Sequence, residues 1–416
     1  MALLILTVFT VGFCMIARRL SSTVLTAPMV FIALGILFAE TGFLPQADAE
    51  TSLHLVAEVA LILLLFLDAA QTDLSALRAR HTWPLRMLII GLPLSILLGT
   101  LAALPLLDGW PIFAVALMAA ILAPTDAALG QAVVTNPIVP ERVRRALTVE
   151  SGLNDGLALP VVLLFASLTA QEMGQDDTNW ILFGAMQLLL GPLAGVFVGY
   201  LGGKLLIAAQ TRQWTSEIYE GIAAVALAGM AYLGADVIGG NGFIAAFVAG
   251  LSFGNVLKGR CKFVYEFTES DGQIVTWAAF FLLGLALVPE AIAHLTWPVF
   301  ALILISLFIV RPLAIWLSLL GSDASPTTRI FFGWFGPRGL ATALFALLVV
   351  QKIDHDFAKP VLFLAVNAVW ISALLHGISA VPGAKLFAAK ISKLGDCPET
   401  EAITVSAKPL ITRHHH

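Results

Sequence analysis

Long apolar runs separated by short polar segments dominate this chain. A helix that crosses a bilayer needs roughly 20 predominantly apolar residues, and alternating strands of the kind that build membrane barrels are not visible. The pattern therefore predicts an all-α polytopic membrane protein with about thirteen transmembrane helices. The thirteen runs cover approximately residues 1–17, 23–39, 54–71, 87–106, 111–131, 145–168, 180–203, 217–234, 239–256, 273–289, 296–320, 328–350 and 360–384.

Charged residues are sorted between successive connections. Lysine and arginine follow the odd-numbered runs, as at 142–145 after the fifth run, whereas the other connections are acidic or neutral. The connection that holds Lys352 and Lys359 is the exception, and it also contains acidic residues. Because cytoplasmic loops are enriched in Lys and Arg, we expect a multi-pass inner-membrane protein with its N-terminus outside and its C-terminus in the cytoplasm.

An odd number of runs allows two six-helix halves, runs 1–6 and 8–13, to lie in opposite orientations. Runs 5 and 12 would then be equivalent, and helix breakers interrupt both of them. Run 5 contains Ala-Pro-Thr-Asp at 123–126, and run 12 contains Gly-Trp-Phe-Gly-Pro-Arg-Gly at 333–339. Paired broken helices in inverted repeats are typical of secondary transporters and indicate a substrate site near the middle of the membrane.

Composition restricts the protein class further. Hydrophobic residues make up 59% of the 416 residues and charged residues only 12%, with a mean hydropathy of +0.92. Soluble domains carry about 25% charged residues, so a soluble enzyme is excluded. The three cysteines lack a disulfide or metal-ligand spacing, and the dispersed basic residues argue against nucleic-acid binding. We interpret 391–413 as a cytoplasmic tail and His414–His416 as the remnant of an affinity tag.

Seven ionisable residues inside the predicted helices are candidates for a structural or functional role. Each costs about 2.5–3.5 kcal/mol on insertion scales, so each needs a structural or functional reason. We interpret Glu58 and Asp68 as cavity or interface groups, and Arg311 as a side chain that reaches the inner surface. The remaining four are Asp126, Glu150, Asp155 and Arg338.

The sixth run contains a compact polar patch. Glu150 and Asn154 are four residues apart, as are Ser151 and Asp155, so the two pairs lie side by side on a helix. Together with the Thr125 hydroxyl and Asp126 of the fifth run, they offer the oxygen ligands that a small alkali cation prefers. One carboxylate can hold either a cation or a proton but not both at once. This competition couples the flux of the cation to the flux of protons. We predict Na⁺ ligands at Asp155, Ser151, Thr125 and Asp126.

A buried arginine needs an anionic partner. We expect Arg338 to form a structural ion pair with Glu150, which leaves Asp155 as the transport carboxylate. No cofactor is expected besides the transported Na⁺ and H⁺.

The motifs Ala-Pro-Thr-Asp at 123–126, Glu-Ser-Gly-Leu-Asn-Asp at 150–155 and Gly-Pro-Arg-Gly at 336–339 resemble the cation:proton antiporters of the NhaP type, within the sodium/proton exchanger superfamily. The resemblance covers roughly residues 1–390 and implies an NhaA-like antiporter fold in a homodimer. It implies a dimerisation domain (runs 1–3 and 7–10) and a core domain (runs 4–6 and 11–13) that moves like an elevator.

The resemblance also implies roles for single residues. Asp155 would be the central cation and proton carboxylate, with Thr125, Asp126, Ser151 and Asn154 nearby, and Glu150 and Arg338 would form the structural ion pair. Because Asn154 stands where electrogenic relatives carry a second aspartate, it implies electroneutral one-for-one exchange of Na⁺, or of Li⁺ or K⁺, for H⁺.

Three other functions remain open from the residues. A sodium-coupled transporter of an organic anion would need cationic groups aimed at a carboxylate, which the acidic patch disfavours. A channel would need a selectivity filter, and no filter-like repeat is visible. An intramembrane hydrolase is possible with two aspartates, but the H-E-x-x-H and G-x-S-x-G motifs are missing.

Overall fold

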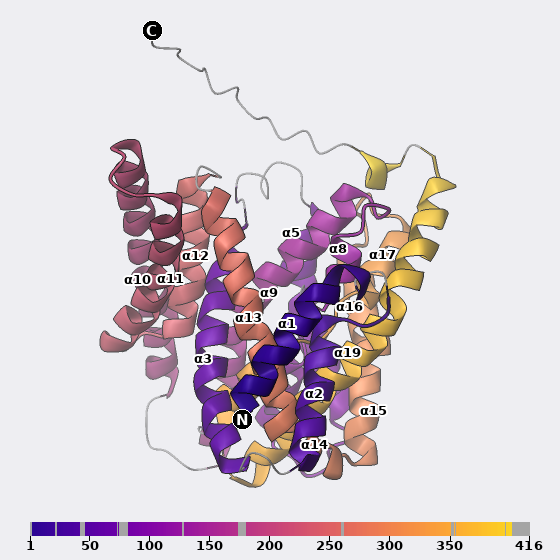
Figure 1. Ribbon diagram of the computed structural model, residues 1–416. Coiled ribbons are helices and arrows are strands. Elements are labelled where there is room, and N and C mark those ends of the chain that lie inside the picture. The colour runs from indigo at the N-terminus through magenta and orange to yellow at the C-terminus, as the bar shows by residue number, and fades with distance from the viewer. Residues whose placement is uncertain are drawn as a thin grey trace.

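A computed structural model shows how the runs pack. It describes residues 2–20, 23–41, 46–72, 74, 82–126, 129–173, 180–258, 262–350, 353, 355–395 and 397–401. Within these ranges every regular element is a helix (Figure 1). The predicted tail beyond residue 401 and the three terminal histidines lie outside the described residues.

The described helices agree with the predicted all-α class. Seven are long and apolar enough to cross a membrane, and six further apolar helices are shorter, all counted within the described ranges. The elements are α1 (Ala2–Leu20), α2 (Ala27–Thr41), α3 (Gln46–Ala70), α5 (Thr82–Arg86), the π-helix η1 (Met87–Gly91), α6 (Leu92–Ala103), α7 (Ile112–Ile121), α8 (Gln131–Val134), α9 (Glu141–Glu172), α10 (Trp180–Thr211), α11 (Glu217–Val237), α12 (Gly242–Leu257), α13 (Lys262–Ala286), α14 (Val288–Ala293), α15 (Trp297–Ile305), the π-helix η2 (Ser306–Val310), α16 (Arg311–Ser318), α17 (Pro326–Trp334), α18 (Leu340–Val350), α19 (His355–Ser392) and the 3₁₀ turn η3 (Pro398–Thr400).

Two groups of helices pack side by side. The α3 group contains α1–α3 and α10–α13, and the α9 group contains α5–α9 and α15–α19. Figure 1 shows α10, α11 and α12 on one side of the molecule and α15, α16, α17 and α19 on the other. The groups meet where α3 and α12 contact α9 and where α3 contacts α18.

Small residues allow close helix packing within the α3 group. A Cβ atom at Gly250 or Gly254 of α12 would overlap the carbonyl oxygens of Phe66 and Ala70 on α3. Packing of this kind is a common way for membrane helices to associate, because lipid removes the hydrophobic drive between them. It fixes α3 against α12 beside the polar part of α9.

The predicted interruptions of runs 5 and 12 are present. Helix α7 ends at Ile121 and the chain continues without helix through 123–126; helix α17 ends at Trp334 and α18 begins at Leu340. Pro124 and Pro337 lie in these breaks, as expected for residues that lack a backbone N–H donor. The two breaks lie beside each other in the α9 group.

The turn η3 is docked on the α9 group. Arg142 of α9 donates a hydrogen bond to the carbonyl of Pro398 at 2.7 Å. The buried carboxylate of Glu399 accepts hydrogen bonds from the Thr328 hydroxyl at 2.6 Å and the Ser325 N–H at 2.9 Å, at the start of α17. Burial raises the pKa of Glu399, but these hydrogen bonds outweigh burial and leave the pKa below its ordinary value of 4.5.

We expect Glu399→Gln to release η3 at neutral pH. Hydrogen bonds to a charged group contribute about 2 kcal/mol, so hydrogen-exchange protection of residues 397–401 should fall about 30-fold. In the unmodified protein the carboxylate stabilises docking above pH 4.5, the ordinary value, and this stabilisation is lost as pH falls through the lower, docked-state pKa. Equal protection in both proteins at pH 7, after correction for intrinsic exchange rates, would contradict this role.

Candidate functional site

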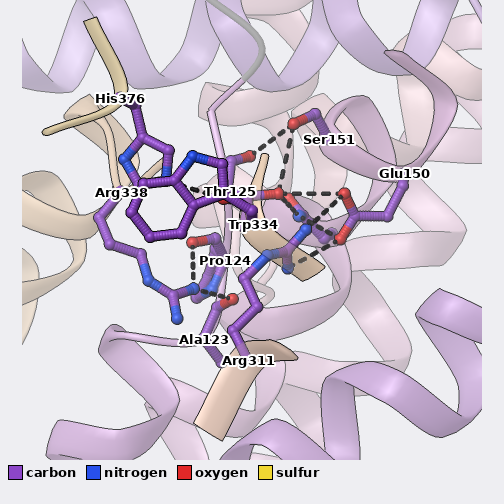
Figure 2. Close-up of polar contacts among 10 residues, drawn as sticks. Ala123, Pro124, Thr125, Glu150, Ser151, Arg311, Trp334, Arg338 and His376 are labelled. Carbon is purple, nitrogen blue, oxygen red and sulfur yellow. Dashed lines mark hydrogen bonds and ion pairs between the residues drawn. The ribbon is translucent and has the colours of Figure 1, made fainter. Parts of the chain in front are cut away.

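The two broken helices exchange hydrogen bonds where they cross. The Asp126 N–H donates to the Pro337 carbonyl at 2.8 Å, and the Asp126 carboxylate accepts from the Leu340 N–H at 3.1 Å. In return, the Arg338 guanidinium donates to the carbonyls of Ala123 and Pro124, at 2.5 and 3.0 Å (Figure 2). Each break therefore satisfies backbone groups that the other leaves without helical partners.

The charges at the crossing match the ends of the half-helices. A helix N-terminus carries partial positive charge and a C-terminus partial negative charge. Asp126 lies at the N-terminus of α18, and Arg338 lies just beyond the C-terminus of α7. Asp126 therefore caps a helix end with one carboxylate oxygen, which reduces its availability as the cation ligand that the sequence predicted.

Two glycines permit this close approach. A Cβ atom at Gly339 would overlap the Asp126 carboxylate, and one at Gly336 would overlap the Arg311 guanidinium. Both positions are therefore restricted by charged groups that are themselves held by hydrogen bonds.

Gly339→Ala should destabilise the protein by about 1–3 kcal/mol, the usual cost of overpacking, and should impair transport. The reason is that the added methyl group displaces Asp126 from its cap on α18. The matched control is Gly229→Ala in α11, where a Cβ would meet nothing within 4 Å; there alanine should stabilise the helix by up to about 1 kcal/mol. Thermal unfolding in detergent measures both, and equal unfolding midpoints for the two variants would refute the assignment.

The predicted ion pair between Glu150 and Arg338 is wrong. Glu150 instead pairs with Arg311 of α16, which donates from both terminal nitrogens to the two carboxylate oxygens at 3.2 Å each. The side chains of this pair are 3% and 4% exposed. The expectation that Arg311 reaches the inner surface is also wrong, because its guanidinium is buried.

Arg338 faces the other side of the break. In Figure 2 its guanidinium points to the Ala123 and Pro124 carbonyls, while Arg311 points to Glu150. Arg338 also donates to the Ser306 hydroxyl of η2 at 3.3 Å. Backbone carbonyls of the broken helix thus accept the hydrogen bonds of Arg338, where the sequence had suggested a carboxylate partner.

Thr125, Ser151 and Asn154 come together as predicted from the sequence. The Asn154 amide donates to the Thr125 hydroxyl at 2.5 Å and to Glu150 at 3.3 Å. The Thr125 hydroxyl donates to Glu150 at 3.2 Å, and the Ser151 hydroxyl donates to the Thr125 carbonyl at 3.0 Å. This network holds the break of run 5 against one face of α9.

Asp155 follows this network on α9. Its Oδ1 atom is buried and accepts no hydrogen bond from the described residues, and the same holds for Oδ1 of Asn154. Asp126, Asp68 and Glu150 are close enough to interact with the Asp155 carboxylate electrostatically. A buried carboxylate oxygen without a donor is costly unless a proton or a cation satisfies it.

A further series of hydrogen bonds behind Arg338 was not predicted from the sequence. The Arg338 N–H donates to the Ser372 hydroxyl at 2.7 Å, and this hydroxyl lies 3.1 Å from Nδ1 of His376. The His376 Nε2 lies 2.8 Å from the Trp334 carbonyl at the end of α17, and the two rings stack. The four-residue spacing of Ser372 and His376 in run 13 was the available signal, but it did not indicate a partner.

The match to a family model now defines the class of protein. Residues 5–385 match the family of sodium/hydrogen exchangers, transmembrane, and the chain belongs to this family of secondary transporters. The NhaP-type resemblance seen in the motifs is confirmed. The members of this family are secondary transporters and not enzymes, in agreement with the apolar, membrane-length helices of the described residues.

Alignments with individual relatives cover most of this chain. A K(+)/H(+) antiporter NhaP2 of Shewanella sp. (strain ANA-3) is 29% identical over 376 residues, which are 86% of this chain and 62% of that protein. A K(+)/H(+) antiporter NhaP of Alkalimonas amylolytica is 25% identical over 91% of this chain and 65% of that protein. The chain thus spans less than two thirds of the length of these relatives.

A solved structure shows the same fold. The sodium proton antiporter MjNhaP1 from Methanocaldococcus jannaschii, determined at pH 8, superposes with a TM-score of 0.78 at 21% identity. The match covers 95% of this chain and 99% of that one.

Proposed function

We propose that this protein exchanges a monovalent cation for protons across the inner membrane. Sodium is the expected cation, and lithium and potassium are the alternatives. The observation that carries the proposal is the buried Asp155 oxygen, which has no hydrogen-bond donor among the described residues, beside a polar network in which Glu150 and Arg311 form an ion pair. One carboxylate can bind a proton or a cation but not both, so the two fluxes are coupled by competition. Further cation ligands are proposed at Thr125, Ser151 and the Oδ1 atom of Asn154, which accepts no hydrogen bond from the described residues.

The charges at the site support a proposal of electroneutral one-for-one exchange. Glu150 and Arg311 cancel each other, and Arg338 and Asp126 lie together at the crossing. Asp155 is then the charge that ion binding neutralises, and H⁺ or one monovalent cation neutralises it equally. Moving a neutral unit avoids the cost of about 2.3 kcal/mol per charge and 100 mV.

The arrangement of helices supports a proposal for the transport movement. The α3 group contains the runs that the resemblance assigns to a dimerisation domain, and the α9 group, which holds both breaks, contains the runs that it assigns to a core domain. We propose that the α9 group moves like an elevator against the α3 group in a homodimer. Thirteen crossings with the N-terminus outside would place the docked turn η3 at the cytoplasmic face.

Transport of an organic anion is not favoured by the site. Arg311 and Arg338 are the cationic groups at the crossing, and Glu150 and backbone carbonyls already engage them. A carboxylate substrate would have to displace one of these partners.

The test is proton movement in liposomes that contain the purified protein and carry an imposed pH gradient. NaCl, LiCl or KCl is added in turn, and a pH-sensitive dye reports collapse of the gradient. Sodium should collapse it, with no change when valinomycin and potassium clamp the voltage. If only potassium collapses the gradient, the transported cation is potassium and not sodium. If the rate depends on the voltage, the exchange is not electroneutral. If none of the three cations collapses the gradient, the proposal of antiport is refuted.

A further inference from the structure

A second polar cavity lies between the two helix groups, away from the crossing. Its volume is about 220 Å³. Glu58 and His54 of α3 and Tyr232 of α11 line it on one side, and Leu344 and Leu347 of α18 line it on the other. The Tyr232 hydroxyl donates a hydrogen bond to the Glu58 carboxylate. A carboxylate at membrane depth must face water or protein and not lipid, and this cavity supplies that space.

The cavity has a counterpart toward the opposite end of α3. A cavity of about 300 Å³ is lined by Asp68 of α3, Gly152 of α9 and several polar residues. Glu58 and Asp68 are ten residues apart on α3, which corresponds to about 15 Å along the helix axis. Helix α3 therefore presents one carboxylate to each cavity.

Asp155 lies on α9 between residues that contact the Asp68 cavity and α12, whereas the Glu58 cavity is lined from α3, α11, α12 and α18. Gly152 lines the Asp68 cavity, and Gly156, one turn further along α9, lies directly against the ring of Phe247. Phe243, one turn from Phe247 on α12, lines the Glu58 cavity and packs on Tyr232 with ring centroids 4.9 Å apart. The buried rings of Phe247 and Phe243 thus follow one another from Gly156, beside Asp155, to the wall of the Glu58 cavity.

We propose that the Glu58 cavity is a binding site for a hydrated monovalent cation, at the entrance opposite the Asp68 cavity. This inference rests on the proposed antiport. The cavity has room for about seven waters at about 30 Å³ each, so a cation enters it hydrated. Leucine side chains form its other wall, and low-dielectric walls around one carboxylate concentrate its field on a cation. The Tyr232 hydroxyl holds the carboxylate toward the cavity.

The cation then reaches Asp155 when the α9 group moves and the aromatic rings no longer separate the two. Glu58 thereby raises the local cation concentration on one side of the membrane without taking part in the exchange at Asp155. Its removal affects one direction of transport more than the other.

The test compares Glu58→Gln with the unmodified protein in right-side-out and everted membrane vesicles. Half-saturating sodium should rise about 3–10-fold when sodium is added at the Glu58 face and stay unchanged at the other face, with the maximal rate retained. Tyr232→Phe should shift the same parameter in the same direction by a smaller factor. Asp108→Asn is the matched control. Asp108 is exposed, and Trp110, two residues further on, packs on Phe357 at the start of α19. Because α19 follows α18, whose leucines line the cavity, Asp108 lies at the same end of the molecule.

Two results would overturn the site. One is an unchanged half-saturation at both faces in Glu58→Gln; the other is an equal shift at both faces, which a structural effect would give. Unmodified protein that moves no cation in either vesicle refutes the proposed antiport and the entrance site with it. Normal exchange by unmodified protein combined with either of the first two results removes the entrance site alone.

Discussion

Replacement of Asp155 by Asn should reduce cation-driven proton movement to the level of protein-free liposomes, a loss of at least about 100-fold. Asparagine keeps the size of the side chain but neither releases a proton nor carries the charge that balances a cation. If the Asp155 oxygen without a donor is where the two ions compete, no other group of the network replaces it. Glu150 is already held by Arg311.

The matched control for this prediction is Asp236→Asn, which removes an exposed acid from α11. It should retain the activity of the unmodified protein. Neither variant should unfold at a lower temperature than the unmodified protein, because one removes a carboxylate with a buried oxygen that lacks a donor among the described residues and the other removes an exposed acid. An active Asp155→Asn variant would assign the ion competition to another carboxylate.

Arg311→Met should destabilise the protein by about 3–5 kcal/mol, because it leaves the Glu150 carboxylate buried without its cation. Glu150→Gln should also destabilise it, since the Arg311 guanidinium then lacks an anion. The double variant should recover much of the loss, because two groups removed together leave no unpaired charge. Thermal unfolding in detergent provides the cycle, with an expected coupling of about 2 kcal/mol.

A second double-variant cycle, between Glu150 and Arg338, tests the corrected pairing directly. Glu150→Gln combined with Arg338→Met should show weaker coupling, because Arg338 donates to the Ala123 and Pro124 carbonyls instead. Stronger coupling of Glu150 to Arg338 than to Arg311 would restore the pair that the sequence suggested.

The polar network could be predicted from the sequence because its parts are local. Ser151, Asn154 and Glu150 lie on one helix with spacings of three and four residues, and prolines mark both breaks. Thr125 reaches this face because Pro124 interrupts run 5 beside it. The broken helices therefore followed from helix breakers and the polar patch of run 6 from helical periodicity, whereas the meeting of Thr125 with Ser151 and Asn154 was implied by the resemblance to the NhaP-type antiporters.

The partner of Glu150 could not be predicted in this way. Arg311 directly follows η2, a π-helix over Ser306–Val310, and a π-helical turn contains more residues than an α-helical turn. It rotates every later side chain relative to a 3.6-residue period, so the direction of Arg311 cannot be read from the spacing of run 11. The contact of Tyr232 with Glu58 and the docking of Glu399 join distant segments, and they likewise leave no periodic signal.

The docked turn η3 gives the protein its own attachment points for spectroscopic probes. Cys397 directly precedes η3 and is fastened through it to the α9 group, while Cys14 is exposed on α1 in the α3 group. With Cys261 replaced by serine, a pair of labels on these two native thiols would measure the separation of the helix groups. Such labels would follow single molecules through a transport cycle without any engineered cysteine.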